Sequence, residues 1–135
     1  MVTLKKIHHI NFIVADLEAS VQNYQNVLGL GSFEYEDLPK RGVRTARARV
    51  GDVWIVLVSP HSKDSVAGRY LENRGEGFFL LSFGVDNLDQ AMAELAQRGT
   101  VAADAATRTG LLGWQVADLK TEDSLGVRFH LTEVD

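Results

Sequence analysis

The sequence predicts an α+β fold made of two tandem βαβββ modules, and three observations lead to this prediction. First, segment 9–17 aligns without a gap on segment 80–88, with Phe, Val and Leu at the same places in both copies. Second, each copy runs into an amphipathic stretch with helical spacing. Third, each amphipathic stretch is followed by three further strand candidates. With a helix on one side of each small sheet, the other sheet face lines a concavity. We therefore expect a cupped, partly closed mixed sheet with helices outside.

The first module begins with a strand at residues 7–14, where apolar residues alternate. Asp16 is a favourable N-cap for the helix that follows, and Gly29 is a suitable residue to end it. Three strands are expected next, at about 32–38, 43–50 and 53–59, and a charged linker helix is expected at 62–74.

The second module repeats this order from a strand at 78–85. Asn87 and Gln90 form a capping box before a helix that ends near Gly99. Further strands are expected near 100–104, 113–119 and 126–134.

The composition is that of one ordinary globular domain, with 135 residues, 45% of them hydrophobic and 24% charged. Because no low-complexity segment divides the chain, we expect a single domain over residues 1–135. It would comprise a module at 1–60, a linker at 61–76 and a module at 77–135.

Bulk properties exclude several classes of function. A net charge of -4 argues against nucleic acid and anionic membranes as partners, and the absence of cysteine excludes disulfides, thiolate zinc sites and a cysteine nucleophile. No segment has the roughly 18 consecutive apolar residues of a membrane span, and the N-terminal residues lack the apolar run of a signal peptide. We therefore expect a cytoplasmic protein whose partner is a small molecule.

Strand parity predicts which side chains line the concavity. The more apolar face of each strand should meet the helix, which leaves the other face for the cleft. The side chains expected to face the cleft are His9, Asn11, Ile13, Leu80, Ser82, Gly84, Arg128, His130 and Thr132. Superposing the two modules places Val56 at the position of His130.

Several segments resemble the glyoxalase, bleomycin-resistance and dioxygenase superfamily, also called the vicinal oxygen chelate superfamily. Residues 7–10 (Ile-His-His-Ile) and 14–18 (Val-Ala-Asp-Leu-Glu) are similar to its opening strand and helix start. Residues 27–30 (Val-Leu-Gly-Leu) are similar to the end of its first helix, and residues 70–77 to its entry into the second module. The resemblance is closest to the methylmalonyl-CoA epimerase and lactoylglutathione-lyase-like branch, and it implies a glyoxalase-like fold.

The resemblance also implies a metal position that this chain does not keep intact. Relatives hold a divalent metal with four side chains, which fall here on His9, Val56, Leu80 and His130. Valine and leucine have no lone pair to donate, and a catalytic divalent ion normally takes at least three protein ligands. We therefore expect no cofactor; the alternative is a divalent metal (Zn, Ni, Co, Mn or Fe) held by His9 and His130.

Histidine and arginine are the remaining candidates for chemistry. His9 and His130 are able to move a proton or orient a polar ligand, and Arg128 is placed to stabilise an enolate. Arg47 and Arg49 share a strand face and form a potential fork for a carboxylate or phosphate. The residues expected to bind the ligand are Asn11, Arg47, Arg49, Trp54, Val56, Leu80 and Ser82.

Two functions remain open at this point. The first is a lyase, an isomerase or epimerase, or a dioxygenase-like enzyme that acts on a small carbonyl or carboxylate compound. The second is a metal-free ligand-binding or drug-sequestering protein of the bleomycin-resistance type. The resemblance also implies a homodimer.

Overall fold

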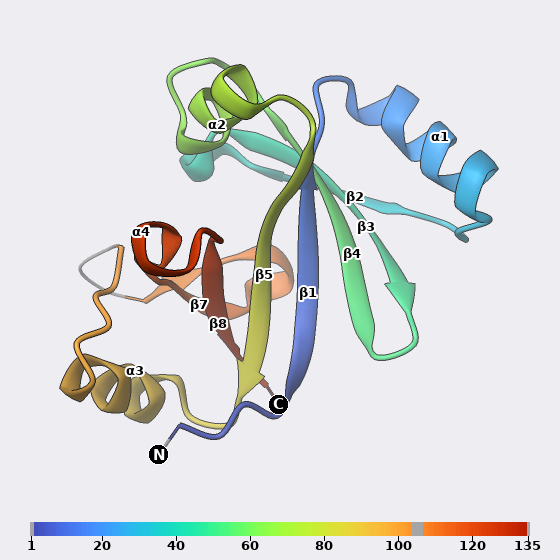
Figure 1. Ribbon diagram of the computed structural model, residues 1–135. Helices are drawn as coiled ribbons and strands as arrows, with labels where there is room; N and C mark the ends of the chain where they lie inside the picture. Colours follow the sequence, from blue (N-terminus) through green and yellow to red (C-terminus); the bar gives the residue numbers. More distant parts are fainter. Residues whose placement is uncertain (1, 104–106, 135) are drawn as a thin grey trace. The chain divides into compact units, whose positions relative to one another are not determined.

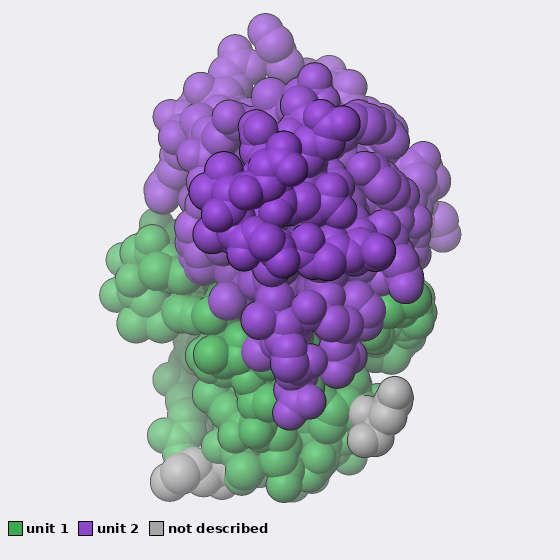
Figure 2. Space-filling view, turned by 90° about the vertical axis from the view of Figure 1, so that its right-hand side faces the viewer, with its two compact units in different colours: residues 1–8, 80–135 green, residues 9–79 purple. Residues whose placement is uncertain are grey.

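A computed structural model describes residues 2–103 and 107–134 of the chain. The chain divides into two compact units, one formed by residues 9–79 and the other by residues 1–8 together with 80–135 (Figure 2). Each unit combines helices with a four-stranded mixed arrangement of strands, so the predicted α+β fold is confirmed.

The order of the elements is shown in Figure 1. The helices are α1 (Leu17–Leu28), α2 (Val66–Arg74), α3 (Leu88–Gln97) and α4 (Glu122–Leu125), with 3₁₀ turns at Pro39–Arg41 and Leu111–Gly113. The strands are β1 (Lys6–Ile13), β2 (Glu34–Leu38), β3 (Val43–Val50), β4 (Val53–Pro60), β5 (Gly77–Val85), β6 (Arg108–Thr109), β7 (Gln115–Asp118) and β8 (Phe129–Glu133).

In the unit of residues 9–79, the strands lie in the order β2-β3-β4-β1. β4 pairs in parallel with β1 and antiparallel with β3, which pairs antiparallel with β2. Helix α1 packs on one face of these strands. That core contains Leu17 and Val21 from the helix and Ala46 and Leu57 from the strands, with Phe12 packed against it. The apolar parity predicted for the first strand is therefore confirmed.

The unit of residues 1–8 and 80–135 repeats this pattern. Its strands lie in the order β5-β8-β7-β6, with β5 and β8 parallel and the other pairs antiparallel. Helix α3 packs on one face, where Leu88 and Ala91 meet Val85, Ala117 and Leu131. The predicted duplication is therefore present in both pairing and packing.

Local capping explains where the two main helices begin. The Asp16 carboxylate accepts a hydrogen bond of 3.0 Å from the Ala19 amide at the start of α1. The Asn87 side chain accepts one of 2.9 Å from Gln90 at the start of α3. Both helices begin where the sequence predicts, because each side-chain oxygen satisfies an amide that has no partner within its helix.

Three predicted elements depart from the structure by three residues or more. The strand expected at 100–104 is not formed by the described residues of that range. They make only an isolated bridge between Ala102 and Leu119, and position 104 lies outside the described residues. This Ala-rich stretch has weak strand propensity, and the edge strand β6 lies further along the chain. The last strand begins at Phe129 rather than 126, because α4 and its cap Gly126 precede it. Helix α2 begins at Val66 rather than Ser62, because the Ser65 hydroxyl caps it.

None of the helices in the described part of the chain is long and apolar enough to cross a membrane.

Candidate functional site

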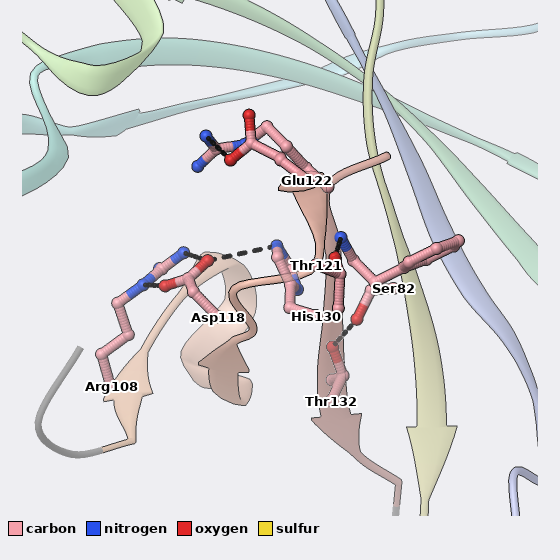
Figure 3. Close-up of polar contacts among 9 residues, drawn as sticks. Ser82, Arg108, Asp118, Thr121, Glu122, His130 and Thr132 are labelled. Atoms are coloured by element: carbon pink, nitrogen blue, oxygen red, sulfur yellow. Dashed lines mark hydrogen bonds and ion pairs between the residues drawn. The ribbon is translucent and has the colours of Figure 1, made fainter. Parts of the chain in front are cut away.

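The face of β5, β8 and β7 opposite α3 carries a row of buried polar residues. Ser82 on β5 lies opposite His130 on β8, and His130 lies opposite Asp118 on β7. His130 is only 4% exposed and Asp118 only 6% exposed. The strand pairing therefore places a buried imidazole beside a buried carboxylate (Figure 3).

Asp118 is held by Arg108 from the edge strand β6. The Arg108 Nε donates to Asp118 Oδ2 over 2.8 Å, and Nη2 donates to Oδ1 over 3.2 Å. Figure 3 shows this two-pronged contact. Such a pair fixes the plane of the carboxylate and compensates its charge, which burial alone would make costly.

The His130 Nε2 lies 3.8 Å from Asp118 Oδ1. This separation is too long for a hydrogen bond but is within ion-pair range when the imidazole is protonated. A proton taken up by His130 therefore has a nearby counter-charge. Arg108 already compensates part of that counter-charge through its two contacts with Asp118.

Neighbouring polar contacts support the strand that carries His130. The Ser82 and Thr132 hydroxyls are hydrogen-bonded over 2.7 Å and are both fully buried. The Thr121 hydroxyl donates to the Val127 carbonyl and accepts from the Phe129 amide, over 2.7 Å and 3.2 Å, which fixes the chain as it enters β8.

Arg128 precedes β8 and is paired with α4. Its Nη1 donates to Glu122 Oε1 over 2.9 Å, and its side chain is only 20% exposed. The Glu122 carboxylate offsets the positive charge of Arg128.

In the unit of residues 9–79, the face opposite α1 carries a second polar row. The row crosses all four strands of this unit, with each residue opposite the next. Its members are Asn11 on β1, Val56 on β4, Arg47 on β3 and Glu34 on β2. Arg47 donates to Glu36 Oε1 over 2.8 Å and to Glu34 Oε2 over 3.1 Å. Its side chain is only 6% exposed, so Arg47 is a buried cation neutralised from the edge strand.

Trp54 lies on the same face, one row away. The guanidinium carbons of Arg49 and Arg47 lie 4.8 Å and 5.7 Å from the centre of its ring. Trp54 is also opposite His9 in the β1–β4 pair, and His9 is buried. The structure thus brings together six of the sequence-predicted residues in this unit: His9, Asn11, Arg47, Arg49, Trp54 and Val56.

The two polar rows occupy equivalent places in the two modules. Ala46 on β3 and Ala117 on β7 both pack against their module's helix, and the residues that follow them are Arg47 and Asp118. The same position therefore carries a buried cation in one module and a buried anion in the other.

The residues present do not fit the four-ligand metal position that the resemblance implies. Val56 and Leu80 are both buried and offer no donor atom. In the described ranges 2–103 and 107–134, no three His, Cys, Asp or Glu side chains come together in a way that would hold a metal ion. No chemical step is therefore assigned to a metal.

Arg44 lies on the opposite face of β3 from Arg47 and is not part of the polar row. It donates to Glu18 on α1 over 2.7 Å, and both side chains are largely exposed. The hydrogen bond from Arg44 lowers the pKa of the Glu18 carboxyl, and the same contact raises the pKa of Arg44. This pair is a surface contact between strand and helix.

Duplicated βαβββ modules with a polar row on the helix-free face define a glyoxalase-type fold. Consistent with this, residues 8–117 match the family described as the Glyoxalase/Bleomycin resistance protein/Dioxygenase superfamily, and the chain belongs to this superfamily.

Within the superfamily, the chain is similar to methylmalonyl-CoA epimerases. It is 28% identical over 131 residues to the mitochondrial methylmalonyl-CoA epimerase of Homo sapiens, covering 96% of this chain and 74% of the human protein. A variant of the Streptomyces coelicolor methylmalonyl-CoA epimerase, solved in complex with 2-nitronate-propionyl-CoA, superposes with a TM-score of 0.92 at 28% identity, over 97% of this chain and 98% of that one. The Mycobacterium tuberculosis methylmalonyl-CoA epimerase gives a TM-score of 0.91 at 26% identity, over 98% and 89% of the two chains.

Sequence reasoning missed the partners of the predicted residues. Four charged residues were not among the predicted site residues: Asp118, Arg108, Glu34 and Glu36. Each of them is paired with another charged side chain of the site or of its supporting strands. One signal was available. The gap-free alignment of the two modules, extended to the third strand, places Asp118 on the same face as Arg47.

Proposed function

We propose that this chain is an isomerase- or epimerase-type enzyme that moves a proton beside the carbonyl of a small acyl compound without a metal. The class of compound suggested by the relatives is a coenzyme A thioester that carries a carboxylate. The observation that carries the proposal is the buried array of His130, Asp118 and Arg108.

In the proposed reaction, His130 acts as a general base. The imidazole takes the proton from the carbon next to the thioester carbonyl, and the electron pair of the C–H bond moves into an enolate. Asp118 stabilises the resulting imidazolium, and Arg108 fixes the plane of the Asp118 carboxylate. A second acid delivers a proton to the opposite face of the enolate, which gives the epimer, and exchange with solvent restores both proton-transfer groups, so atoms and charge balance over the cycle.

The enolate needs a positive counter-charge or a hydrogen-bond donor. Arg128 is the proposed group, as the sequence predicts, with Glu122 holding its guanidinium in place. Arg47 and Arg49 are proposed to contribute to ligand binding. His9 is proposed as a second proton-transfer group.

Hydrogen–deuterium exchange tests the proposal directly. Protein treated with a chelator, with its metal content checked by elemental analysis, is incubated with methylmalonyl-CoA in D₂O, and deuterium in the acyl group is followed by mass spectrometry. We expect exchange by the metal-free protein, loss of about 10²-fold or more in His130→Gln, and a separate decrease in His9→Ala. No exchange by the native protein, or exchange that returns only with Zn, Ni, Co, Mn or Fe, would overturn the metal-free mechanism.

The second candidate function is a metal-free ligand-binding or drug-sequestering protein. It is favoured by the buried Val56 and Leu80, which place aliphatic side chains where the relatives are expected to carry ligating ones. Tight binding of an acyl compound with no exchange in the native protein supports this second function over the first.

The cytoplasmic location and the homodimer are further proposals. Sedimentation equilibrium of the full chain tests the second, with a single species of twice the monomer mass as the expected result.

A further inference from the structure

Two buried polar atoms flank Val56 on the face opposite α1, and neither has a hydrogen-bond partner within the described residues. They are Asn11 Oδ1, an acceptor, and Arg47 Nε, a donor. Both residues are paired with Val56 in strand register, one from each side. An unsatisfied buried donor or acceptor costs about 1–3 kcal/mol, so two in one row call for a partner, either an internal water or a group of a bound ligand.

The surroundings of Arg47 determine the charge of that group. The other two guanidinium nitrogens of Arg47 are already occupied by Glu34 and Glu36, so the charge of Arg47 is already compensated. A carboxylate or phosphate approaching Nε would be repelled by these two carboxylates. The row therefore suits a neutral group that accepts a hydrogen bond at one end and donates one at the other.

Strand spacing sets the approximate scale of that group. Asn11 and Arg47 lie on the two strands that flank β4, so their backbones are roughly 10 Å apart, because neighbouring strands are about 4.8 Å apart. A trans secondary amide presents its C=O and N–H in opposite directions, about 2.3 Å apart. With a hydrogen bond of about 2.9 Å at each end, it spans roughly 8 Å between its two partners.

From these observations we propose that Asn11 and Arg47 form a subsite for a neutral secondary amide of the ligand. The amide oxygen accepts from Arg47 Nε, and its N–H donates to Asn11 Oδ1. The amide belongs to a pantetheine arm, the part of an acyl-CoA next to the thioester. This assignment of the amide rests on the proposed function, whereas the subsite itself depends only on the row of residues.

Calorimetric titration with two matched probes tests the subsite without any turnover. The first probe is propionyl-pantetheine, which contains two amides. The second probe is an ester analogue in which oxygen replaces the N–H of one amide, and it is made in two versions, one for each amide. The ester keeps the carbonyl acceptor but loses the donor to Asn11. We expect the native protein to bind one ester version roughly tenfold more weakly than the amide.

Variants of the two residues complete a thermodynamic cycle. In Asn11→Leu, the amide and the ester should bind equally, because the acceptor is gone. In Asn11→Asp, which keeps an acceptor, the preference for the amide over the ester should remain. In Arg47→Lys, which keeps the charge and loses Nε, both probes should weaken by a similar factor and the preference should persist. Arg44→Lys, on the other face of the same strand, is the matched control and should bind like the native protein.

The outcomes separate the subsite from its alternatives. Equal binding of the amide and both esters by the native protein would overturn the subsite and leave internal water as the partner of the two atoms. An amide preference that survives in Asn11→Leu would also overturn it. An amide preference seen with S-propionylglutathione rather than the pantetheine probe would support the subsite and assign its amide to a peptide. Amide-selective binding without hydrogen–deuterium exchange would keep the subsite and reject the proposed reaction.

Discussion

Asp118 lies directly opposite His130 in the β7–β8 pair, and its carboxylate Oδ1 is 3.8 Å from the imidazole Nε2. The equivalent residue of the other module is Arg47. A duplicated scaffold has thus acquired opposite buried charges at one position, and each is compensated from its own edge strand, by Arg108 on β6 or by Glu34 and Glu36 on β2.

Replacing Asp118 by Asn should slow deuterium exchange by about tenfold to 10³-fold, because the imidazolium loses its counter-charge and orientation while the side-chain volume is kept. The measurement is the exchange assay at saturating methylmalonyl-CoA. Since Asp118→Asn also leaves Arg108 without its anion, circular dichroism and thermal unfolding must show a folded protein. An exchange rate equal to that of the native protein would remove Asp118 from the mechanism.

The Ser82–Thr132 hydroxyl pair should be coupled in stability. The two oxygens are 2.7 Å apart and fully buried, so Ser82→Ala or Thr132→Val alone leaves the other hydroxyl without this partner, at a cost of about 1–3 kcal/mol. The double variant should cost less than the sum of the two single variants, because no unsatisfied hydroxyl remains. Urea unfolding of the four proteins measures the coupling. Strict additivity would mean that the hydroxyls act independently.

The framework of each module was predictable because it depends on local signals. Asp16 and Asn87 are N-caps that act within three residues, and the alternation around Phe12 places one strand face on the core. Such signals are read from a short window of sequence. The α1 and α3 starts and the β3 strand were therefore predicted closely.

The charge partners at the site were not predictable in the same way, because they depend on strand register. Asp118 is twelve positions before His130 and ten after Arg108, and nothing in those spacings shows that the three side chains meet. Register is set by pairing across the sheet, and a shift of one residue would turn Asp118 to the other face. Helix α4 was missed for another reason: one turn that ends at Gly126 has too few residues to show helical periodicity.

Gly68 should tolerate no side chain. A Cβ at this position would lie 1.9 Å from the Ser62 carbonyl oxygen, a backbone atom, where the chain folds closely over the start of α2. We expect Gly68→Ala to lower the free energy of unfolding by about 1–3 kcal/mol through overpacking. Gly31→Ala is the matched control, because a Cβ there meets nothing within 4 Å, and it should be neutral or slightly stabilising. Equal stabilities of the two variants in urea would contradict the close contact at Gly68.

Tyr24 on α1 should make stability fall at high pH. Burial against the α1 core raises the pKa of the Tyr24 hydroxyl, and the negative charge of Glu76 raises it further. Because the folded pKa lies above the unfolded value of about 10, this contribution to stability is present below pH 10 and is lost as the pH rises through the folded pKa.

Tyr24→Phe cannot ionise, so its stability relative to the native protein should increase between pH 9 and pH 11. Glu76→Gln keeps the acceptor for the Ala15 amide and removes the charge, and should produce a smaller change in the same direction, since burial is the larger cause. Parallel stability curves for native protein and Tyr24→Phe over this range, measured by urea unfolding, would show that Tyr24 ionises as readily in the folded chain as in the unfolded one.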